Sequence, residues 1–149
     1  MKVYFGADHR GFRLKQQLLI FVRGLGFEAI DLGNTVLDMD DDYADFAAKV
    51  GGAVGHDPEH ARGIVLCGSG AGVDATVNKV KGVRATIGFS SAQITDARRD
   101  DDINILALAS GFLGETEAEE IVERFLKTLF SGEERHKRRI EKITAIENG

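Results

Sequence analysis

The hydrophobic positions of the chain alternate between short continuous runs and longer stretches with helical spacing. The runs are rich in β-branched and aromatic residues and cover residues 3–5, 29–32, 63–66, 83–87 and 103–108. Runs of this kind are typical of strands that are buried on both faces of a parallel sheet. In the other stretches, apolar residues recur every three or four positions, within residues 14–25, 43–54, 73–80 and 118–129. These four stretches are predicted helices.

Individual residues also indicate where some of these elements begin or end. Gly26 is expected to end the first helix, and Thr116 is expected to cap the fourth. The alternation predicts an α/β fold with right-handed crossovers and a doubly wound, five-stranded parallel sheet. Residues 133–149 add a charged helix with a narrow apolar stripe, which needs either the domain itself or a second subunit to dock on.

Composition narrows the class of protein. The 149 residues fit one domain, residues 1–149, with 43% apolar and 29% charged residues, which is ordinary for a globular protein. The net charge of -5 argues against nucleic-acid binding. No apolar run suits a membrane helix or a signal peptide, so we expect a cytoplasmic protein without a membrane partner. The single cysteine excludes a disulfide framework and a cysteine-based zinc site.

Three polar clusters follow predicted strands. Asp8 and His9 follow the first strand, residues 67–72 follow the third, and Ser90 and Ser91 follow the fourth. In a sheet of this type, ligands bind outside the carboxyl ends of the strands. We therefore expect these clusters to meet at one edge of the sheet.

The glycine-rich turn after the third strand has alternating glycines at 68, 70 and 72. Such a turn lets backbone N–H groups converge on an anion, either a phosphate or a developing enediolate. It is not a dinucleotide fingerprint, because Val73 stands where the third glycine is needed, and it lacks the Gly-Lys-Ser/Thr of a phosphate-binding Walker loop. Val73 also replaces the arginine of a cysteine-phosphatase loop. A purely structural turn is the alternative.

Cys67 begins this turn. A lone cysteine is more often a buried small apolar residue than a catalyst. At a strand-to-helix turn, however, the helix dipole favours the thiolate and lowers the thiol pKa from about 8.5, which suits a base that removes a proton next to a carbonyl. Ser69 could hydrogen-bond substrate oxygens or simply cap the helix.

Other polar residues have both a structural and a functional interpretation. His9 could form a turn pair with Asp8 or bind a ligand at the strand end. Arg135 and Arg139 share a helical face and, taken alone, indicate a solvated basic surface. The acidic run at residues 38–42 lacks the glycine and glutamate of a calcium loop, so a solvated acidic loop is favoured.

Five ordered motifs carry a resemblance that extends from Met1 to about Ile143. They are G-A-D-H-R-G at residues 6–11, D-Y-A-D-F-A at 42–47, C-G-S-G-A-G at 67–72, N-K-V at 78–80 with G-V-R-A at 82–85, and R-H-K-R-R-I at 135–140. Together they resemble the ribose-5-phosphate isomerase B family, which also includes galactose-6-phosphate isomerase.

The resemblance implies a Rossmann-like three-layer sandwich that needs neither metal nor cofactor and has its active sites at a homodimer interface. Dimers could pair further into tetramers. It also implies interconversion of aldose and ketose phosphates, most simply ribose 5-phosphate and ribulose 5-phosphate, through a cis-enediolate.

The resemblance further assigns roles to residues. Cys67 would be the base, while Ser69 and the turn at Gly68, Gly70, Ala71 and Gly72 would stabilise the enediolate. The phosphate would be held by His9, Arg135 and Arg139, and the sugar hydroxyls by Asp8 and Tyr43.

Three positions depart from the family pattern. The family usually has histidine and asparagine where this chain has Asp100 and Asp101, and Gly111 stands in place of a family arginine. The family uses that histidine in opening the sugar ring. Asp100 could replace it as acid/base, with neighbouring carboxylates raising its pKa. Alternatively, the substrate is a tetrose 4-phosphate, which cannot close a five-membered ring, or another sugar phosphate such as a hexose 6-phosphate, or the chain binds sugar phosphates without catalysis.

Overall fold

The computed structural model describes all residues, Met1–Gly149, and has five parallel strands in one sheet. The strands are β1 (Lys2–Ala7), β2 (Glu28–Asp31), β3 (Ala61–Cys67), β4 (Ala85–Ile87) and β5 (Ile105–Ala109), in the spatial order β2-β1-β3-β5-β4. The predicted α/β class with a five-stranded parallel sheet is therefore confirmed.

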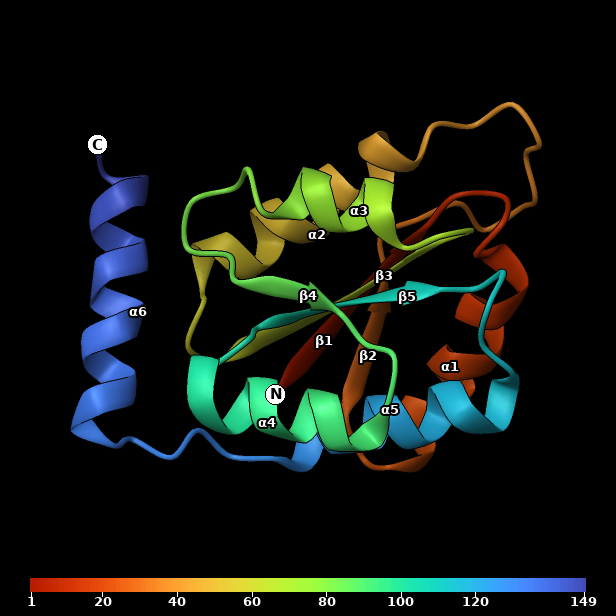
Figure 1. Cartoon of the computed structure of the whole chain (residues 1–149). Coiled ribbons are helices and arrows are strands. Elements are labelled where there is room, and N and C mark those ends of the chain that lie inside the picture. Colours follow the sequence, from red (N-terminus) through yellow and green to blue (C-terminus); the bar gives the residue numbers. More distant parts are fainter.

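Helices cover both faces of the sheet and complete a three-layer sandwich (Figure 1). The helices α1 (Phe12–Gly24), α4 (Ser91–Asp101) and α5 (Glu115–Lys127) pack on one face, and α2 (Tyr43–His56) and α3 (Ala71–Val77) pack on the other. Each face has its own apolar cluster, because the central strands are buried on both sides. Burial of each large side chain, such as Phe5 or Leu106, stabilises the fold by about 1.5–3 kcal/mol.

The last helix, α6 (Glu134–Glu147), stands apart from the sandwich, beyond the amino ends of the strands (Figure 1). Only His136 of this helix is buried, and Ile143 and Ile146 remain exposed. One hydrogen bond ties its end to the sandwich, from the Gly82 N–H to Glu147 Oε1 (2.9 Å). Most of the narrow apolar stripe is thus left without a partner inside the chain.

Some element boundaries differ from the sequence prediction. The helix α5 begins at Glu115 with Gly114 as its N-cap, so Thr116 lies inside the helix and its predicted capping role is wrong. Two glutamates in the first turn of α5 complement the helix dipole instead. The sequence analysis did not predict α4, because only Ile94 and Arg98 of that helix are buried. Gly26 adopts φ +94° beyond the end of α1, as expected.

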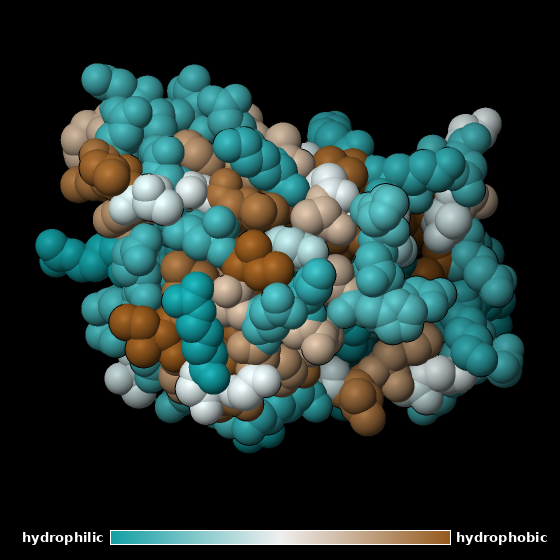
Figure 2. All heavy atoms as spheres, turned by 180° about the vertical axis from the view of Figure 1, so that it is seen from behind, coloured by the Kyte–Doolittle hydropathy of each residue, from teal (hydrophilic) through white to brown (hydrophobic).

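On the face shown in Figure 2, polar side chains surround several separate groups of apolar side chains. Several large apolar side chains are exposed on loops that follow strands, namely Val36, Leu37, Met39, Phe89 and Phe112. No helix of the structure has both the length and the apolar character needed to cross a membrane.

Candidate active site

The carboxyl ends of the strands bring the predicted polar clusters to one edge of the sheet. Asp8 and His9 follow β1, and Cys67 is the last residue of β3. The loop after β5 joins these two segments, because Ser110 Oγ donates to the carbonyl oxygens of Arg10 (2.8 Å) and Cys67 (3.0 Å). The expectation of a meeting at one edge is therefore confirmed for the clusters after β1 and β3, but no contact joins Ser90 and Ser91 to them.

Cys67 is held in place by its backbone. Its carbonyl oxygen accepts hydrogen bonds from both the N–H and the hydroxyl of Ser110. The residue is 5% exposed and belongs to the apolar cluster that includes Val73 and Ala107. Its thiol is free, and its position at the strand terminus places it directly beside the glycine-rich turn.

The glycine-rich turn leads from β3 into α3 and has a backbone conformation that requires glycine at position 70. Gly70 has φ +76°, a left-handed conformation that side chains disfavour, and it serves as the N-cap of α3. The Ser69 hydroxyl accepts a hydrogen bond from the Ala71 N–H (3.3 Å), but Ser69 is not the N-cap that the sequence offered as its alternative role, because Gly70 occupies that position. Ser69 is exposed beside the carboxyl end of β3.

Two side chains lie against the turn. A Cβ atom at Gly72 would lie 2.5 Å from the Tyr43 ring, so the phenol packs directly on that glycine. A Cβ atom at Gly68 would overlap the Arg10 guanidinium, and one at Gly111 would come within 3.3 Å of it. The sequence analysis did not single out Arg10. The only available signal was its position directly after His9 at a strand end.

Asp8 has a structural task at this edge. Its Oδ1 accepts hydrogen bonds from the N–H groups of Arg10 (3.0 Å) and Gly11 (3.1 Å) and so fixes the turn into α1. Gly11 is required there, because a Cβ atom would lie 2.7 Å from the Leu66 side chain. The Asp8 side chain thereby sets the position of the neighbouring His9.

His9 pairs with an aspartate that the sequence analysis placed in a solvated acidic loop. The Asp41 Oδ1 atom accepts hydrogen bonds from the His9 N–H (2.9 Å) and lies 2.8 Å from His9 Nδ1. The Asp41 side chain is only 5% exposed. The prediction of a solvated loop is therefore wrong for Asp41, because the fold turns this side chain inward. The hydrogen bond to Asp41 raises the pKa of His9, and the charge of Asp8 adds to this rise against partial burial and the charge of Arg10.

Four predicted site residues lie at the opposite edge of the sheet. The helix α4 begins after the carboxyl end of β4 and ends just before β5, so Asp100 and Asp101 lie near the amino ends of the strands. The start of α6 lies beside them, because His136 Nε2 is 3.7 Å from Asp100 Oδ1. Arg135 and Arg139 on this helix are exposed. Within one chain, this second group does not meet Cys67.

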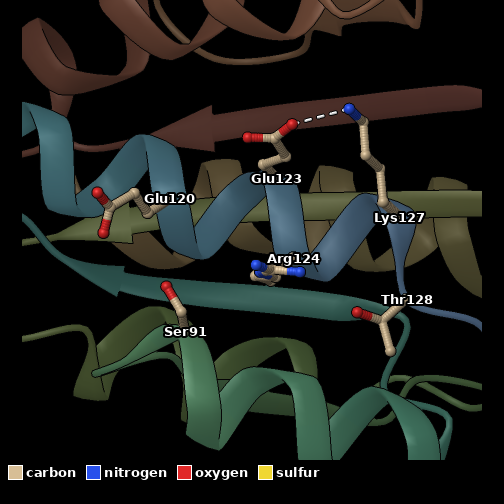
Figure 3. Close-up of a pocket in the computed structure, with 6 residues that line it drawn as sticks. All are labelled: Ser91, Glu120, Glu123, Arg124, Lys127 and Thr128. Atoms are coloured by element: carbon tan, nitrogen blue, oxygen red, sulfur yellow. Dashed lines mark hydrogen bonds and ion pairs between the residues drawn. The ribbon is translucent and has the colours of Figure 1, made fainter.

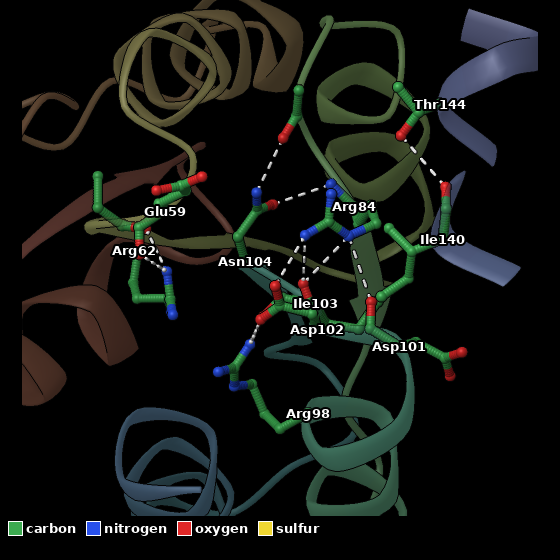
Figure 4. Close-up of polar contacts among 12 residues, drawn as sticks. Glu59, Arg62, Arg84, Arg98, Asp101, Asp102, Ile103, Asn104, Ile140 and Thr144 are labelled. Atoms are coloured by element: carbon green, nitrogen blue, oxygen red, sulfur yellow. Dashed lines mark hydrogen bonds and ion pairs between the residues drawn. The ribbon is translucent and has the colours of Figure 1, made fainter. Parts of the chain in front are cut away.

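A network of charged residues fixes this amino edge (Figure 4). Arg84 donates to the Asp102 carboxylate (3.1 Å), and Arg98 donates to the other oxygen of the same group (2.8 Å). The buried Asn104 joins the loop before β4 to β5 by bonding the Arg84 N–H and the Gly82 carbonyl oxygen. Repulsion from Arg98 and Arg84 adds to burial in lowering the pKa of Arg62. Asp101 and the end of α4 are thereby held in place.

The expected direction of the Asp100 pKa is wrong. Hydrogen bonding to Arg99 lowers this pKa, and the charges of Arg99, His136 and Arg135 reinforce the effect against partial burial. The neighbouring carboxylates were expected to dominate, but the Arg99 Nε atom lies 2.9 Å from Asp100 Oδ1. Asp100 is therefore ionised at neutral pH and holds no proton to donate.

The serines after β4 serve other purposes. Ser90 caps α4 by accepting a hydrogen bond from the Gln93 N–H (3.0 Å). Ser91 lines a polar cavity of about 400 Å³ between α4 and α5, together with residues such as Glu123, Arg124 and Lys127 (Figure 3). No predicted substrate-binding residue lines this cavity.

Comparison with known proteins identifies the family of the whole chain. The family described as Ribose/Galactose Isomerase matches residues 3–143. A probable ribose-5-phosphate isomerase B of Mycoplasma genitalium is 39% identical over 97% of this chain and 95% of its own length. Ribose-5-phosphate isomerase B of Escherichia coli is 37% identical over 98% of this chain and 96% of its own.

Solved structures agree with the sequence comparison. The crystal structure of the Mycoplasma genitalium protein with bound ribulose-5-phosphate superposes with a TM-score of 0.95 at 39% identity, covering 99% of this chain and 96% of that one. Type B ribose 5-phosphate isomerase of Trypanosoma cruzi gives a TM-score of 0.93 at 38% identity, with coverage of 99% and 96%. The chain belongs to the ribose/galactose isomerase family.

Proposed function

We propose that the chain is an aldose–ketose isomerase of phosphorylated sugars that interconverts ribose 5-phosphate and ribulose 5-phosphate. The observation that carries the proposal is the position of Cys67 at the carboxyl end of β3, beside a glycine-rich turn, in a chain that matches isomerases over nearly its whole length. A free thiol of this kind suits a reducing compartment, so we place the protein in the cytoplasm.

In this proposal the Cys67 thiolate removes the proton from C2 of the aldose. The electron pair forms the C1–C2 double bond of a cis-enediolate, and the negative charge moves to the oxygen at C1. The hydroxyl proton of C2 then passes to the oxygen at C1, and the same sulfur returns its proton to C1 as the oxygen at C2 forms the new carbonyl. N–H groups of the turn at Gly70 to Gly72 would stabilise the oxygen charge, and one such donor is typically worth about 3 kcal/mol.

Substrate binding in this proposal begins with the residues around the turn. Tyr43 lies against Gly72 and would contact the sugar hydroxyls, together with the Asp8 carboxylate. His9 would bind the phosphate with its outer ring nitrogen. The Arg10 guanidinium lies over Gly68 and has no carboxylate partner in the chain, so it adds positive charge beside the expected anion.

A second copy of the chain would complete the site. Arg135 and Arg139 are exposed at the amino edge of the sheet, and so is Asp101. They can therefore share a substrate with His9 only if they come from a partner subunit. The exposed apolar side chains of Val36, Met39 and Phe112 on the carboxyl-edge loops support a homodimer that covers this edge, because burial of exposed apolar side chains favours association.

One observation favours a second candidate substrate. Asp100 is ionised and bonded to Arg99, so it is poorly suited to donate the proton that ring opening requires. A tetrose 4-phosphate needs no ring opening. The second candidate is therefore the same isomerisation on a tetrose 4-phosphate.

The test is isotope exchange with a panel of sugar phosphates in deuterated water. The purified protein is incubated with tetrose 4-phosphates, ribose 5-phosphate and a hexose 6-phosphate, and deuterium at C1 and C2 is measured by mass spectrometry. Incorporation into one of these sugars, with conversion of aldose to ketose, supports the isomerase and names its substrate. Binding of a sugar phosphate without any incorporation would leave a binding protein and contradict the proposal.

A further inference from the structure

The Asp41 carboxylate has a position that its sequence context does not suggest. It lies in the loop between β2 and α2, where Asp40 and Asp42 are exposed, yet its own side chain is nearly buried. Both of its oxygens are used. Oδ1 accepts a hydrogen bond from the His9 N–H and is hydrogen-bonded to Nδ1 of the His9 ring. Oδ2 accepts a hydrogen bond from Asn34 Nδ2 (3.1 Å).

Lys15 of α1 anchors the loop that carries Asp41. The buried Lys15 ammonium donates to the Asn34 carbonyl oxygen (2.7 Å) and to both oxygens of Asp31 (2.9 Å each). Asn34 in turn donates to Asp41, so a continuous chain of polar contacts runs from α1 to the His9 ring. The position of the carboxylate is therefore set by the core and does not depend on the substrate.

This contact decides which ring nitrogen of His9 remains free. With Nδ1 bonded to Asp41, only Nε2 is left to meet a ligand. A neutral ring with its proton on Nδ1 would present a bare Nε2 acceptor to a phosphate, which also has only acceptors when it is a dianion. A cationic ring presents an N–H donor instead.

We propose that Asp41 is a positioning residue that holds His9 as an imidazolium with its Nε2–H directed at the phosphate of the substrate. The inference rests on the proposed role of His9 in phosphate binding. Three charged groups face the ring, namely Asp8, Arg10 and Asp41. The two carboxylates favour the cation and Arg10 opposes it, and the direct hydrogen bond makes Asp41 the dominant influence on the His9 pKa.

The experiment compares the wild-type protein with Asp41→Asn, which keeps the size and an acceptor oxygen but removes the charge. The His9 ring is titrated by NMR in the whole protein, and sulfate, which stays a dianion throughout, is used as a phosphate probe. In parallel, KM and kcat for the active sugar phosphate are measured from about pH 6 to about pH 8. Asp57→Asn is the matched control, because Asp57 Oδ1 lies 2.9 Å from His60 Nδ1 in an exposed pair.

The expected result has a defined pH dependence. In Asp41→Asn the His9 pKa falls, KM near pH 8 rises about tenfold through the loss of a charge-assisted hydrogen bond, and KM near pH 6 rises less, because the lower pH favours the cationic ring in both proteins. The value of kcat changes little at either pH. Asp57→Asn changes neither parameter.

Two results would overturn the inference. One is an unchanged His9 titration in Asp41→Asn, and the other is an equal rise in KM at both pH values, which would indicate a merely structural role. If the wild-type protein isomerises no sugar phosphate, the proposed function fails separately. The NMR titration and the sulfate affinity then still decide whether Asp41 controls the charge and the anion binding of His9.

Discussion

The phenol ring of Tyr43 lies directly over the backbone of Gly72, so that a Cβ atom at position 72 would stand 2.5 Å from Cε1 and 2.6 Å from Cζ of the ring. The contact joins the first residue of α2 to the first turn of α3. It fixes an exposed aromatic side chain beside the proposed catalytic turn without burying it. The glycine is therefore needed for the close approach of the ring.

Gly72→Ala should impair catalysis more than folding. The added methyl group pushes the Tyr43 ring aside and shifts the turn, and small displacements of positioning groups cost roughly tenfold to hundredfold in kcat/KM. Steady-state kinetics and urea unfolding measure the two effects. Gly52→Ala is the control, because nothing lies within 4 Å of its added Cβ atom in α2, and it should raise stability by about 0.5–1 kcal/mol with unchanged kinetics. Full activity in Gly72→Ala would show that the ring position is unimportant.

Lys15→Met should destabilise the fold. The substitution leaves the Asp31 carboxylate without its buried partner, and breaking a pair of this kind typically costs about 3 kcal/mol. Urea unfolding at neutral pH measures the loss, with Lys49→Met as the exposed control. A loss in Lys15→Met no greater than in the control would mean that the buried ammonium contributes nothing net.

The pH dependence of stability should report on Asp100. Its pKa is lower in the folded chain than its ordinary value, so its contribution is present above the ordinary aspartate range and is lost as the pH falls through the lowered pKa. Asp100→Asn should therefore lower the urea midpoint at neutral pH but not in strong acid. A difference between wild type and variant that persists unchanged in acid would show that the ion pair with Arg99 is not its cause.

The sequence predicted the central strands well, because β1, β3 and β5 are continuous apolar runs that only a doubly covered sheet can bury. It failed for α4, whose amphipathic pattern is too weak to stand out. In the site, the edge that holds Cys67 and His9 followed from topology alone. The inward turn of Asp41 and the placement of Arg135 on the far edge depend on contacts between distant segments, which no local pattern records. The lowered pKa of Asp100 comes mainly from the side-chain contact with the adjacent Arg99, which the sequence analysis did not consider.

The shared site can be tested by mixing two inactive variants. Cys67→Ala lacks the proposed base, and Arg139→Ala lacks a cation that we assign to the partner's site. If the site is shared, a mixed dimer contains one site with both defects and one intact site, so co-refolded protein should recover about a quarter of wild-type activity. Size-exclusion chromatography verifies dimers. Recovery of no activity, with mixed dimers present, would place both residues in the site of one chain.

The most direct test of the proposed chemistry is Cys67→Ala with the preferred sugar phosphate in deuterated water. The measurement is deuterium at C1 and C2 of the recovered sugar, with binding of the same sugar followed by calorimetry. We expect binding to persist and incorporation to fall below detection, because the group that moves the proton is gone. Incorporation at the wild-type rate in Cys67→Ala would contradict the assignment of Cys67 as the base.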